Sequence, residues 1–369
     1  MKIALVRQRY VAHGGAEQYL RALAAGLAKR GHEVHVFSHW WEPTTGIQFH
    51  HVPVMRTPSF LRALTFAWNC RRGVASYDVV LSLEGTLRQD VYRAGDGCHR
   101  EWLAQRRRFL PAWRRAMLSI NPLHWALLWL ERRVFDPANT RHIIANSARG
   151  KDEIVRHYGF PAERITVVYN GVDTERFKPT ARPGNGTLLF VGSGWERKGL
   201  EFAIRALPHL PEHVRLRVVG KGNRSRYERL ARQLGVAGRV NFAPPQSRIE
   251  EAYAGADVFV FPTIYEPFAN VCLEAMACGL PVVTSRINGA SEIITPGVNG
   301  AILEEPSDAG ALAEAIRPFL NRDALARAAI AARQTAEALP FGANVEQTLA
   351  ILVKLVPGGR VELPTNPDI

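Results

Sequence analysis

The chain contains 369 residues, of which 47% are hydrophobic, and carries a formal net charge of +13 at pH 7. This length suits two domains of average size, and the composition is typical of a globular protein. No run of about 18 or more apolar residues is present, which argues against a transmembrane helix. We expect a cytoplasmic protein, because no signal peptide precedes the first strand and the four cysteines show no C-x-x-C pairing for zinc or disulfides.

The positive charge is concentrated in one half of the chain. Residues 1–170 contain 25 Lys or Arg and 13 Asp or Glu, which gives a net charge of +12. Residues 171–369 contain 22 and 21, which gives only +1. The first half is therefore expected to meet an anionic partner.

Short apolar runs alternate with helical patterns along the chain, which predicts βαβ units, parallel sheets and an α/β fold. The expected strands are residues 3–6, 34–37, 79–83 and 142–145 in the first half, and 188–191, 216–219, 240–242, 258–261 and 281–284 in the second.

A break between the halves is expected near residues 169–173, where turn residues are followed by a Pro- and Gly-rich stretch typical of a linker. Two Rossmann-like domains joined there would place their parallel sheets across a cleft. The expected organisation is a first domain at 1–170, a second at 171–339, a C-terminal helix at 340–356 packing back on the first domain, and a disordered tail at 357–369.

Two carboxylates eight residues apart follow the apolar run 258–261. Glu266 is expected in the loop at the carboxyl end of that strand, and Glu274 one to two turns into a helix at 269–278. Ligands of open α/β sheets bind at this edge, and the first amides of the helix suit an anion. Taken alone, paired acids at a sheet edge are more often plain surface groups than functional ones.

Two basic residues, Arg197 and Lys198, follow the first strand of the second half and are expected to lie opposite Glu266. An adjacent Arg and Lys can act as a bidentate clamp and a point charge for a diphosphate, although a solvated charge pair is the plain alternative. Gly14 and Gly15 end the first strand-to-helix loop, where they either admit a ligand close to the backbone or only make a tight turn.

In this order the motifs resemble those of the retaining glycosyltransferases of family 4, which have the two-domain GT-B fold. The resemblance covers nearly the whole chain. It rests on Gly14-Gly15, Ala145-Asn146-Ser147, Tyr169-Asn170-Gly171-Val172-Asp173, Gly194-x-x-Arg197-Lys198-Gly199, Glu266-x7-Glu274 and Gly279-Leu280-Pro281-Val282-Val283.

The resemblance implies a nucleotide-sugar donor site that needs no metal, and the sequence has no Asp-x-Asp motif. Arg197 and Lys198 would hold the diphosphate, Glu274 the ribose hydroxyls and Glu266 the hydroxyls of the transferred sugar. The backbone at Gly14 and Gly15 would face the donor phosphates, and the amides of Phe268, Ala269, Asn270 and Val271 would complete the donor site.

Within the family, residues 94–99 resemble a segment of bacterial lipopolysaccharide-core glucosyltransferases. The resemblance implies that Asp96 lies near the acceptor and can act as general base. Many relatives use a histidine instead, so His99 stays an alternative, and Asp96 could also be only a turn residue between two glycines.

Residues 100–135 contain eight Arg and two Glu, interleaved with Trp102, Phe109, Trp113, Trp125 and Trp129. This composition favours a helix lying in an anionic membrane interface, with Arg towards the headgroups and Trp at the apolar boundary. Nucleic acid is the rival partner, but no DNA- or RNA-binding motif accompanies the segment. An ordinary pair of helices with inward-facing tryptophans is the third explanation.

We therefore expect a monomeric, metal-independent retaining hexosyltransferase, peripheral on the inner face of the cytoplasmic membrane. It would move glucose from UDP-glucose to a lipopolysaccharide-core or other lipid-linked acceptor, with no cofactor beyond this nucleotide-sugar co-substrate. Another hexose donor with a glycolipid or exopolysaccharide acceptor remains open.

Other classes of enzyme fit the sequence less well. A nucleotide-sugar epimerase of GT-B fold would share the nucleotide site but would not need the basic aromatic segment. An NAD oxidoreductase is disfavoured, because neither Gly14-Gly15 nor Gly192-x-Gly194 has the full dinucleotide-binding spacing with its ribose-binding acid.

Overall fold

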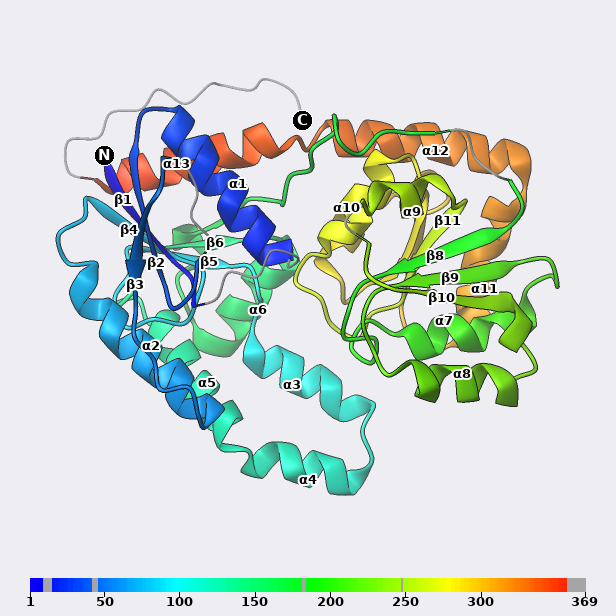
Figure 1. The fold of residues 1–369 in the computed structure, drawn as a ribbon, viewed down its shortest axis with the longest axis horizontal. Coiled ribbons are helices and arrows are strands. Elements are labelled where there is room, and N and C mark those ends of the chain that lie inside the picture. Colours follow the sequence, from blue (N-terminus) through cyan, green and yellow to red (C-terminus); the bar gives the residue numbers. More distant parts are fainter. Residues whose placement is uncertain (9–14, 42–45, 181–183, 247, 357–369) are drawn as a thin grey trace. The chain divides into compact units, whose positions relative to one another are not determined.

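The computed structural model describes residues 1–8, 15–41, 46–180, 184–246 and 248–356. The chain divides into two compact units (Figure 1). One consists of Met1–Tyr169 with the chain from Gly342 onward, and the other of Asn170–Phe341. Each is built on one parallel sheet, which confirms the predicted α/β class with two Rossmann-like domains.

The first unit has a seven-stranded sheet in the order β3-β2-β1-β4-β5-β6-β7, with every neighbouring pair parallel. Its strands are β1 (Lys2–Val6), β2 (Glu33–Ser38), β3 (Gln48–His51), β4 (Val79–Ser82), β5 (Val91–Ala94), β6 (His142–Ala145) and β7 (Ile165–Val167). Three of these strands, β3, β5 and β7, are not predicted from the sequence. The edge strand β3 is polar and mostly exposed, and β5 includes the buried Arg93, so neither shows the apolar run that marks a central strand.

Seven helices accompany this sheet within the described residues. They are α1 (Gly15–Lys29), α2 (Ser59–Gly73), α3 (His99–Arg108), α4 (Ala112–Ile120), α5 (Pro122–Val134), α6 (Ala148–Tyr158) and α13 (Phe341–Leu355), with a short 3₁₀ helix, η1 (Ala162–Arg164). The last helix is joined to the first unit by hydrogen bonds. Tyr19 Oη donates to Asn344 Oδ1 at 3.0 Å, and Asn344 Nδ2 donates to the Tyr169 carbonyl at 2.6 Å.

The second unit has a six-stranded parallel sheet in the order β10-β9-β8-β11-β12-β13. Its strands are β8 (Thr187–Val191), β9 (Arg215–Val219), β10 (Val240–Ala243), β11 (Val258–Phe261), β12 (Val282–Ser285) and β13 (Gly300–Leu303). Its helices are α7 (Leu200–Ala206), α8 (Arg224–Gln233), α9 (Glu250–Ala254), α10 (Asn270–Ala277), α11 (Ala309–Ile316) and α12 (Arg322–Glu337), with 3₁₀ turns η2 (Leu207–His209), η3 (Ala237–Arg239), η4 (Gly289–Ile293) and η5 (Arg317–Leu320). β11 and β12 are buried along their whole length, as expected for strands covered on both faces.

The start of the second sheet is anchored by one buried acid. Asp257, 1% exposed, accepts hydrogen bonds from the backbone amides of Gly184, Asn185, Gly186 and Thr187 at 2.8–3.1 Å. Because four amides converge on one carboxylate, the entry to β8 is held against the entry to β11.

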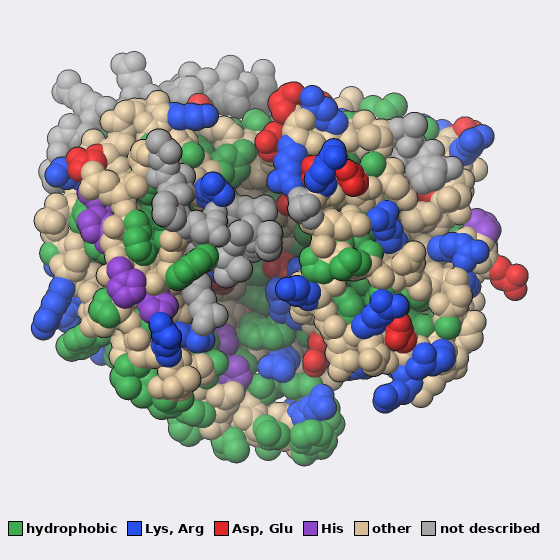
Figure 2. All heavy atoms as spheres, in the orientation of Figure 1, with side chains coloured by type: hydrophobic (Ala, Val, Ile, Leu, Met, Phe, Trp, Pro, Cys, Tyr) green, Lys and Arg blue, Asp and Glu red, His purple; other side chains and the backbone are tan. Residues whose placement is uncertain are grey.

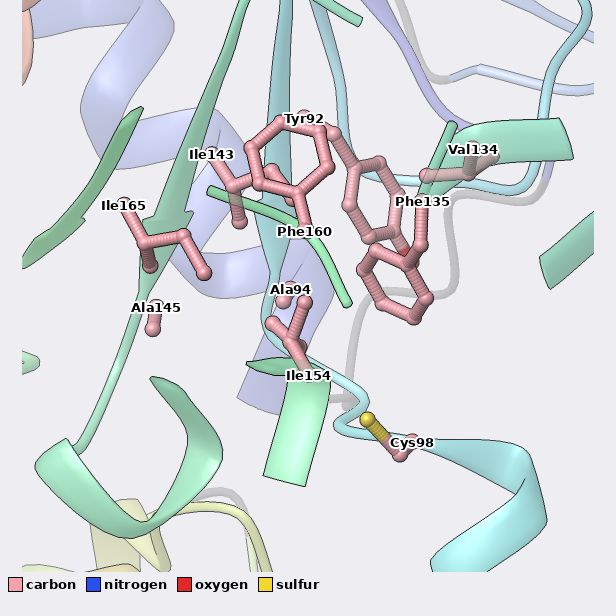
Figure 3. Packing of buried hydrophobic residues seen from close by; sticks show 10 residues of the cluster. All are labelled: Tyr92, Ala94, Cys98, Val134, Phe135, Ile143, Ala145, Ile154, Phe160 and Ile165. Carbon is pink, nitrogen blue, oxygen red and sulfur yellow. The ribbon is translucent and has the colours of Figure 1, made fainter. Parts of the chain in front are cut away.

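An apolar cluster in the first unit supports the loop that carries Asp96 (Figure 3). It joins residues of β5 and β6 to Ile154 of α6, to Phe135 at the end of α5 and to Cys98, the residue before α3. The chain that leaves β5 is thus packed on both sides of the Asp96 loop.

The tail predicted at residues 357–369 lies outside the described residues.

Candidate active site

The loop from β8 to α7 brings Arg197 and Lys198 to the carboxyl edge of the second sheet. Gly199, the residue before α7, has φ 75°, and a Cβ there would lie 1.8 Å from the Pro262 carbonyl oxygen. The loop can therefore approach the end of β11 only because this position lacks a side chain. The Arg197 carbonyl accepts hydrogen bonds from Thr263 Oγ1 and from the Ile264 amide, both at 2.9 Å.

Arg197 and Glu266 form an ion pair at this edge. Arg197 Nη1 lies 2.5 Å from Glu266 Oε2 and also donates to the Tyr265 carbonyl at 3.2 Å. The two side chains are 34% and 17% exposed, so the pair is open to solvent on the arginine side. The backbone of Glu266 is held in turn, since its carbonyl accepts from the Gly289 amide at 2.9 Å. The structure thus places these residues opposite each other, with a guanidinium presented at the sheet edge.

Lys198 lies beside this pair in a mostly apolar environment. Its ammonium is 5.4 Å from the centre of the Phe261 ring and packs so closely on Gly192 that a Cβ there would lie 2.3 Å from Nζ. Burial lowers the pKa of Lys198, and the charge of Glu266 opposes that change. Across the described ranges Nζ has no hydrogen-bond or ion-pair partner. An anionic ligand that binds here could therefore pair with this ammonium group without displacing another residue.

Glu274 is held by a tyrosine from the neighbouring helix. Tyr253 Oη of α9 donates to Glu274 Oε2 at 2.8 Å, and burial raises the pKa of Glu274 above its ordinary value. Burial and the neighbouring carboxylate raise the pKa of Tyr253 as well, so the phenol remains a donor. The second oxygen, Oε1, makes no hydrogen bond to any residue that the structure describes, and it can accept hydrogen bonds from ligand hydroxyl groups.

The start of α10 offers backbone amides at the same edge. Phe268 and Ala269 are buried, and α10 begins at Asn270 without a side-chain cap, which leaves its first amides without a partner in the helix. The Asn270 side chain accepts from Asn170 Nδ2 at 2.6 Å, and Val271 follows in the first turn.

Asn288 supports this turn and was missed from the sequence. Its fully buried side chain accepts from the amides of Ala269 and Ala290, both at 3.1 Å, and donates to Thr284 Oγ1 at 3.0 Å. The only sequence signal is an Asn-Gly pair three residues after a strand, which is equally typical of an ordinary turn.

In the first unit, Asp96 follows β5 and is 60% exposed, with Oδ2 accepting from Arg7 Nη1 at 2.7 Å. His99 begins α3, where its ring nitrogen Nε2 lies 3.0 Å from Nδ1 of His124. Burial and His124 lower the pKa of His99 to about 4, so its ring is neutral and engaged with a second ring.

Glu131 of α5 ties these helices together. Its buried carboxylate accepts hydrogen bonds from the amides of His99 and Arg100, the first two residues of α3, and from Tyr158 Oη of α6. Burial raises the pKa of Glu131 to about 7. A side chain of α5 therefore caps α3, the helix that follows the Asp96 loop.

The glycines predicted near the donor phosphates are only partly covered by the structure. Gly15 is the first residue of α1, whereas Gly14 lies outside the described residues. Within those residues, no group of three or more His, Cys, Asp or Glu side chains is arranged to hold a metal ion.

The basic aromatic segment forms three helices, α3, α4 and α5, rather than one. Trp102 and Phe109 are partly buried, whereas α4 and α5 expose large apolar side chains that include Trp113, Met117, Ile120, Trp125 and Trp129. Arginines lie among them, with Arg114 stacked over Trp113 and Arg133 over Trp129.

A further exposed tryptophan belongs to α2, which packs against α5. It is Trp68, over which Arg71 stacks at 5.1 Å. Hydrophobic and basic side chains lie together over α2 and α4 in Figure 2. No helix in the described part of the chain is long and apolar enough to cross a membrane.

Comparison with known proteins gives the class of the molecule. Residues 13–176 match the model of Glycosyltransferase Family 4, and residues 171–335 match the model named Glycosyl transferases group 1. The chain therefore belongs to the family 4 glycosyltransferases, and its two parallel-sheet domains form a GT-B fold.

Three proteins show the range of its relatives. The chain is 30% identical to lipopolysaccharide glucosyltransferase WaaG of Escherichia coli K12 over 88% of this chain and 91% of that protein. A crystal structure of WaaG superposes with a TM-score of 0.82 at 25% identity, covering 97% of this chain and all of the other. D-inositol 3-phosphate glycosyltransferase of Xylanimonas cellulosilytica is 29% identical over 89% and 88% of the two chains. Anabaena Alr3699/HepE, solved in complex with UDP-glucose, has a TM-score of 0.74 at 22% identity over 96% and 99%.

Proposed function

We propose that this glycosyltransferase moves glucose from UDP-glucose to a lipopolysaccharide-core or other lipid-linked acceptor, with retention of anomeric configuration and without a resident metal ion. The observation that carries the donor site is the placement of Arg197 and Lys198 opposite Glu266 at the carboxyl edge of the second sheet. The name of the WaaG relative supports the acceptor class, and the UDP-glucose complex of Alr3699/HepE supports the donor.

The proposed chemistry rests on where charge develops. When the bond between the sugar and the diphosphate breaks, negative charge grows on the diphosphate and the sugar gains oxocarbenium character. Arg197, Lys198 and the first amides of α10 would stabilise that charge, and such preorganised donors are usually the largest single catalytic contribution. Attack by the acceptor on the same face of the sugar, within this ion pair, gives retention.

The two carboxylates of the second unit would bind different parts of the donor. Glu274, oriented by Tyr253, would accept hydrogen bonds from the ribose hydroxyls. Glu266, oriented by Arg197, would accept them from the sugar. A hydrogen bond from a hydroxyl group to an oriented carboxylate that is shielded from water is stronger than the same bond in water. Because a nucleotide sugar has such hydroxyl groups and a free phosphate does not, the site would favour the nucleotide sugar.

On the acceptor side we propose Asp96 as the group that contacts the attacking hydroxyl. Its carboxylate is exposed, whereas the His99 ring is partly buried and its Nε2 lies 3.0 Å from Nδ1 of His124. The geometry thus favours Asp96 over the histidine alternative.

We also propose that α2, α4 and α5 hold the protein on the anionic inner face of the cytoplasmic membrane. Exposed tryptophans stacked with arginines place an apolar group and a cation side by side, which is the chemistry of a membrane interface. A lipid-linked acceptor would then be met at the surface in which it is anchored.

The test compares two arginines of the second unit. Arg197→Met removes the proposed diphosphate clamp, while Arg226→Met removes a surface arginine that pairs with Glu201 at 3.1 Å. With UDP-glucose and lipopolysaccharide that lacks its core glucose, we expect Arg197→Met to lower the rate of glucosyl transfer about 100- to 1,000-fold and Arg226→Met to leave it unchanged. Near-normal transfer by Arg197→Met would contradict the proposed donor site.

A second candidate is a family 4 transferase with another donor or a smaller acceptor, as the name of the D-inositol 3-phosphate relative suggests. A thermal-shift screen of nucleotide sugars tests the donor, because at a fixed concentration the stabilisation of the fold grows with the logarithm of the ligand's affinity. Analysis of products without an acceptor would reveal an epimerase.

A further inference from the structure

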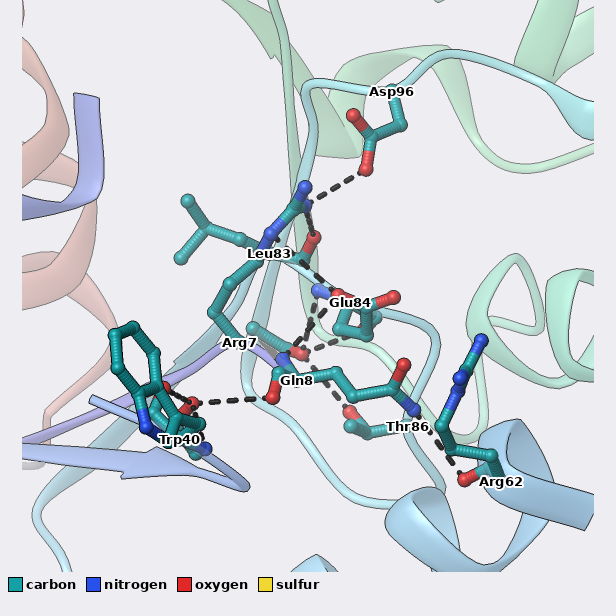
Figure 4. Close-up of polar contacts among 10 residues, drawn as sticks. Arg7, Gln8, Trp40, Arg62, Leu83, Glu84, Thr86 and Asp96 are labelled. Carbon is teal, nitrogen blue, oxygen red and sulfur yellow. Dashed lines mark hydrogen bonds and ion pairs between the residues drawn. The ribbon is translucent and has the colours of Figure 1, made fainter. Parts of the chain in front are cut away.

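Three neighbouring strands of the first sheet end in charged residues, and two of these, Arg7 and Glu84, have no role yet in the proposed chemistry (Figure 4). Arg7 directly follows β1, Leu83 and Glu84 follow β4, and Asp96 follows β5. Because β1, β4 and β5 are adjacent in the sheet, the three ends meet at one edge.

Arg7 is the fixed member of this group. Its side chain is 12% exposed, and Nη1 donates to the Leu83 carbonyl at 2.8 Å while Nε lies 3.6 Å from Glu84 Oε2. The Arg7 amide donates in addition to the Phe37 carbonyl at 3.1 Å. Arg7 is therefore held at both its backbone amide and its guanidinium.

Asp96 is the exposed member, with its side chain 60% exposed. It stands between Gly95 and Gly97, of which Gly97 has φ 71°, and beyond its chain neighbours no atom lies within 4 Å of a Cβ placed at Gly95. An exposed carboxylate on such a loop would rotate freely without a partner. Arg7 Nη1 holds Oδ2 at 2.7 Å, and Oδ1 accepts no hydrogen bond from the described residues.

We infer that Arg7 is a positioning residue for the acceptor, acting through Asp96: it fixes the carboxylate by Oδ2 and leaves Oδ1 for a hydroxyl group of the acceptor sugar. This inference rests on the proposed function, since it needs an acceptor that meets Asp96. Holding a reacting group in place contributes through orientation, and a displacement of about 1 Å can lower a rate about 100-fold.

The alternative is that Arg7 only stabilises the sheet edge, and a double-mutant cycle distinguishes the two. Arg7→Met and Arg7→Lys are each combined with Asp96→Asn, and melting temperature, affinity for UDP-glucose, and affinity and transfer to lipopolysaccharide lacking its core glucose are measured. We expect Arg7→Met to lower acceptor kcat/KM about 10- to 100-fold in the native background and less than about 3-fold beside Asp96→Asn, with donor affinity unchanged. Arg7→Lys should lose less, because it keeps the charge without the planar fork.

Equal losses in both backgrounds overturn the inference and assign Arg7 to the sheet edge. If Asp96→Asn abolishes transfer, the same comparison is made with the acceptor affinities of the four proteins. If Arg7→Met does not fold, Arg7→Lys takes its place in the cycle. Absence of transfer by the unchanged protein refutes the proposed function together with this inference, whereas transfer with additive losses refutes the inference alone.

Discussion

Two isoleucines of similar exposure on different helices allow the proposed membrane contact to be measured. Ile120, the last residue of α4, is 69% exposed, and Ile330 on α12 is 62% exposed. Burying a whole isoleucine side chain contributes about 1.5–3 kcal/mol, so moving the exposed two thirds of Ile120 into the interface contributes about 1–2 kcal/mol. Because about 1.4 kcal/mol is a factor of ten, Ile120→Ser should weaken vesicle binding about 5- to 30-fold, while Ile330→Ser should leave it unchanged.

The assay is cosedimentation with phosphatidylglycerol–phosphatidylcholine vesicles, repeated with phosphatidylcholine alone and at raised salt. Anionic vesicles should bind the unchanged protein more tightly, and salt should weaken that binding because part of it comes from arginines near the surface. Equal, weak binding to both kinds of vesicle would refute the membrane proposal. Equal losses from the two isoleucine variants would show that α4 is not the inserted element.

Three further predictions concern hydrogen bonds and protonation. Tyr253→Phe should weaken UDP-glucose binding about fivefold in calorimetry, since Glu274 loses the donor that orients it, and unchanged affinity would argue against Glu274 as the ribose ligand. Asp257→Ala should lower the free energy of unfolding of the second unit by about 2–4 kcal/mol in urea, because four amides lose their acceptor. The pKa of His99 is about 4 in the folded chain against an ordinary 6.5, so the unfolded chain binds more protons between these values. The free energy of unfolding should therefore fall as the pH is lowered through this window, and a titration of His99→Asn with the same fall would contradict the assignment.

The positions of the residues proposed for the donor site were predictable because their signals are local. Arg197 and Glu266 each follow an apolar run that is recognisable as a buried strand, and parallel strands bring their carboxyl ends to one edge. The fold class followed from the same alternation of apolar runs and helical patterns, and the family from the order of the motifs. Both were confirmed.

Other parts of the site depend on contacts that no local pattern records. Arg7 and Asp96 are 89 residues apart in the chain, and their pairing follows only from the order of strands in the sheet. Asn288 looks like a turn residue until its buried side chain is seen between the start of α10 and the end of β12. Trp68 lies outside the basic segment and joins its surface only because α2 packs on α5.

The hydrogen bonds of Glu131 limit how the proposed membrane contact can be tested by deletion. The Glu131 side chain of α5 accepts hydrogen bonds from the first two amides of α3. The same hydrogen bonds therefore hold the arginine-rich helices together and fix the start of α3, which follows the turn bearing Asp96. Deleting residues 100–135 to obtain a detached enzyme would release that turn as well, and the loss of activity would be misread as a requirement for lipid. A form that does not bind membranes is better sought by changing the outward-facing residues of α4, with Glu131 and its partners left intact.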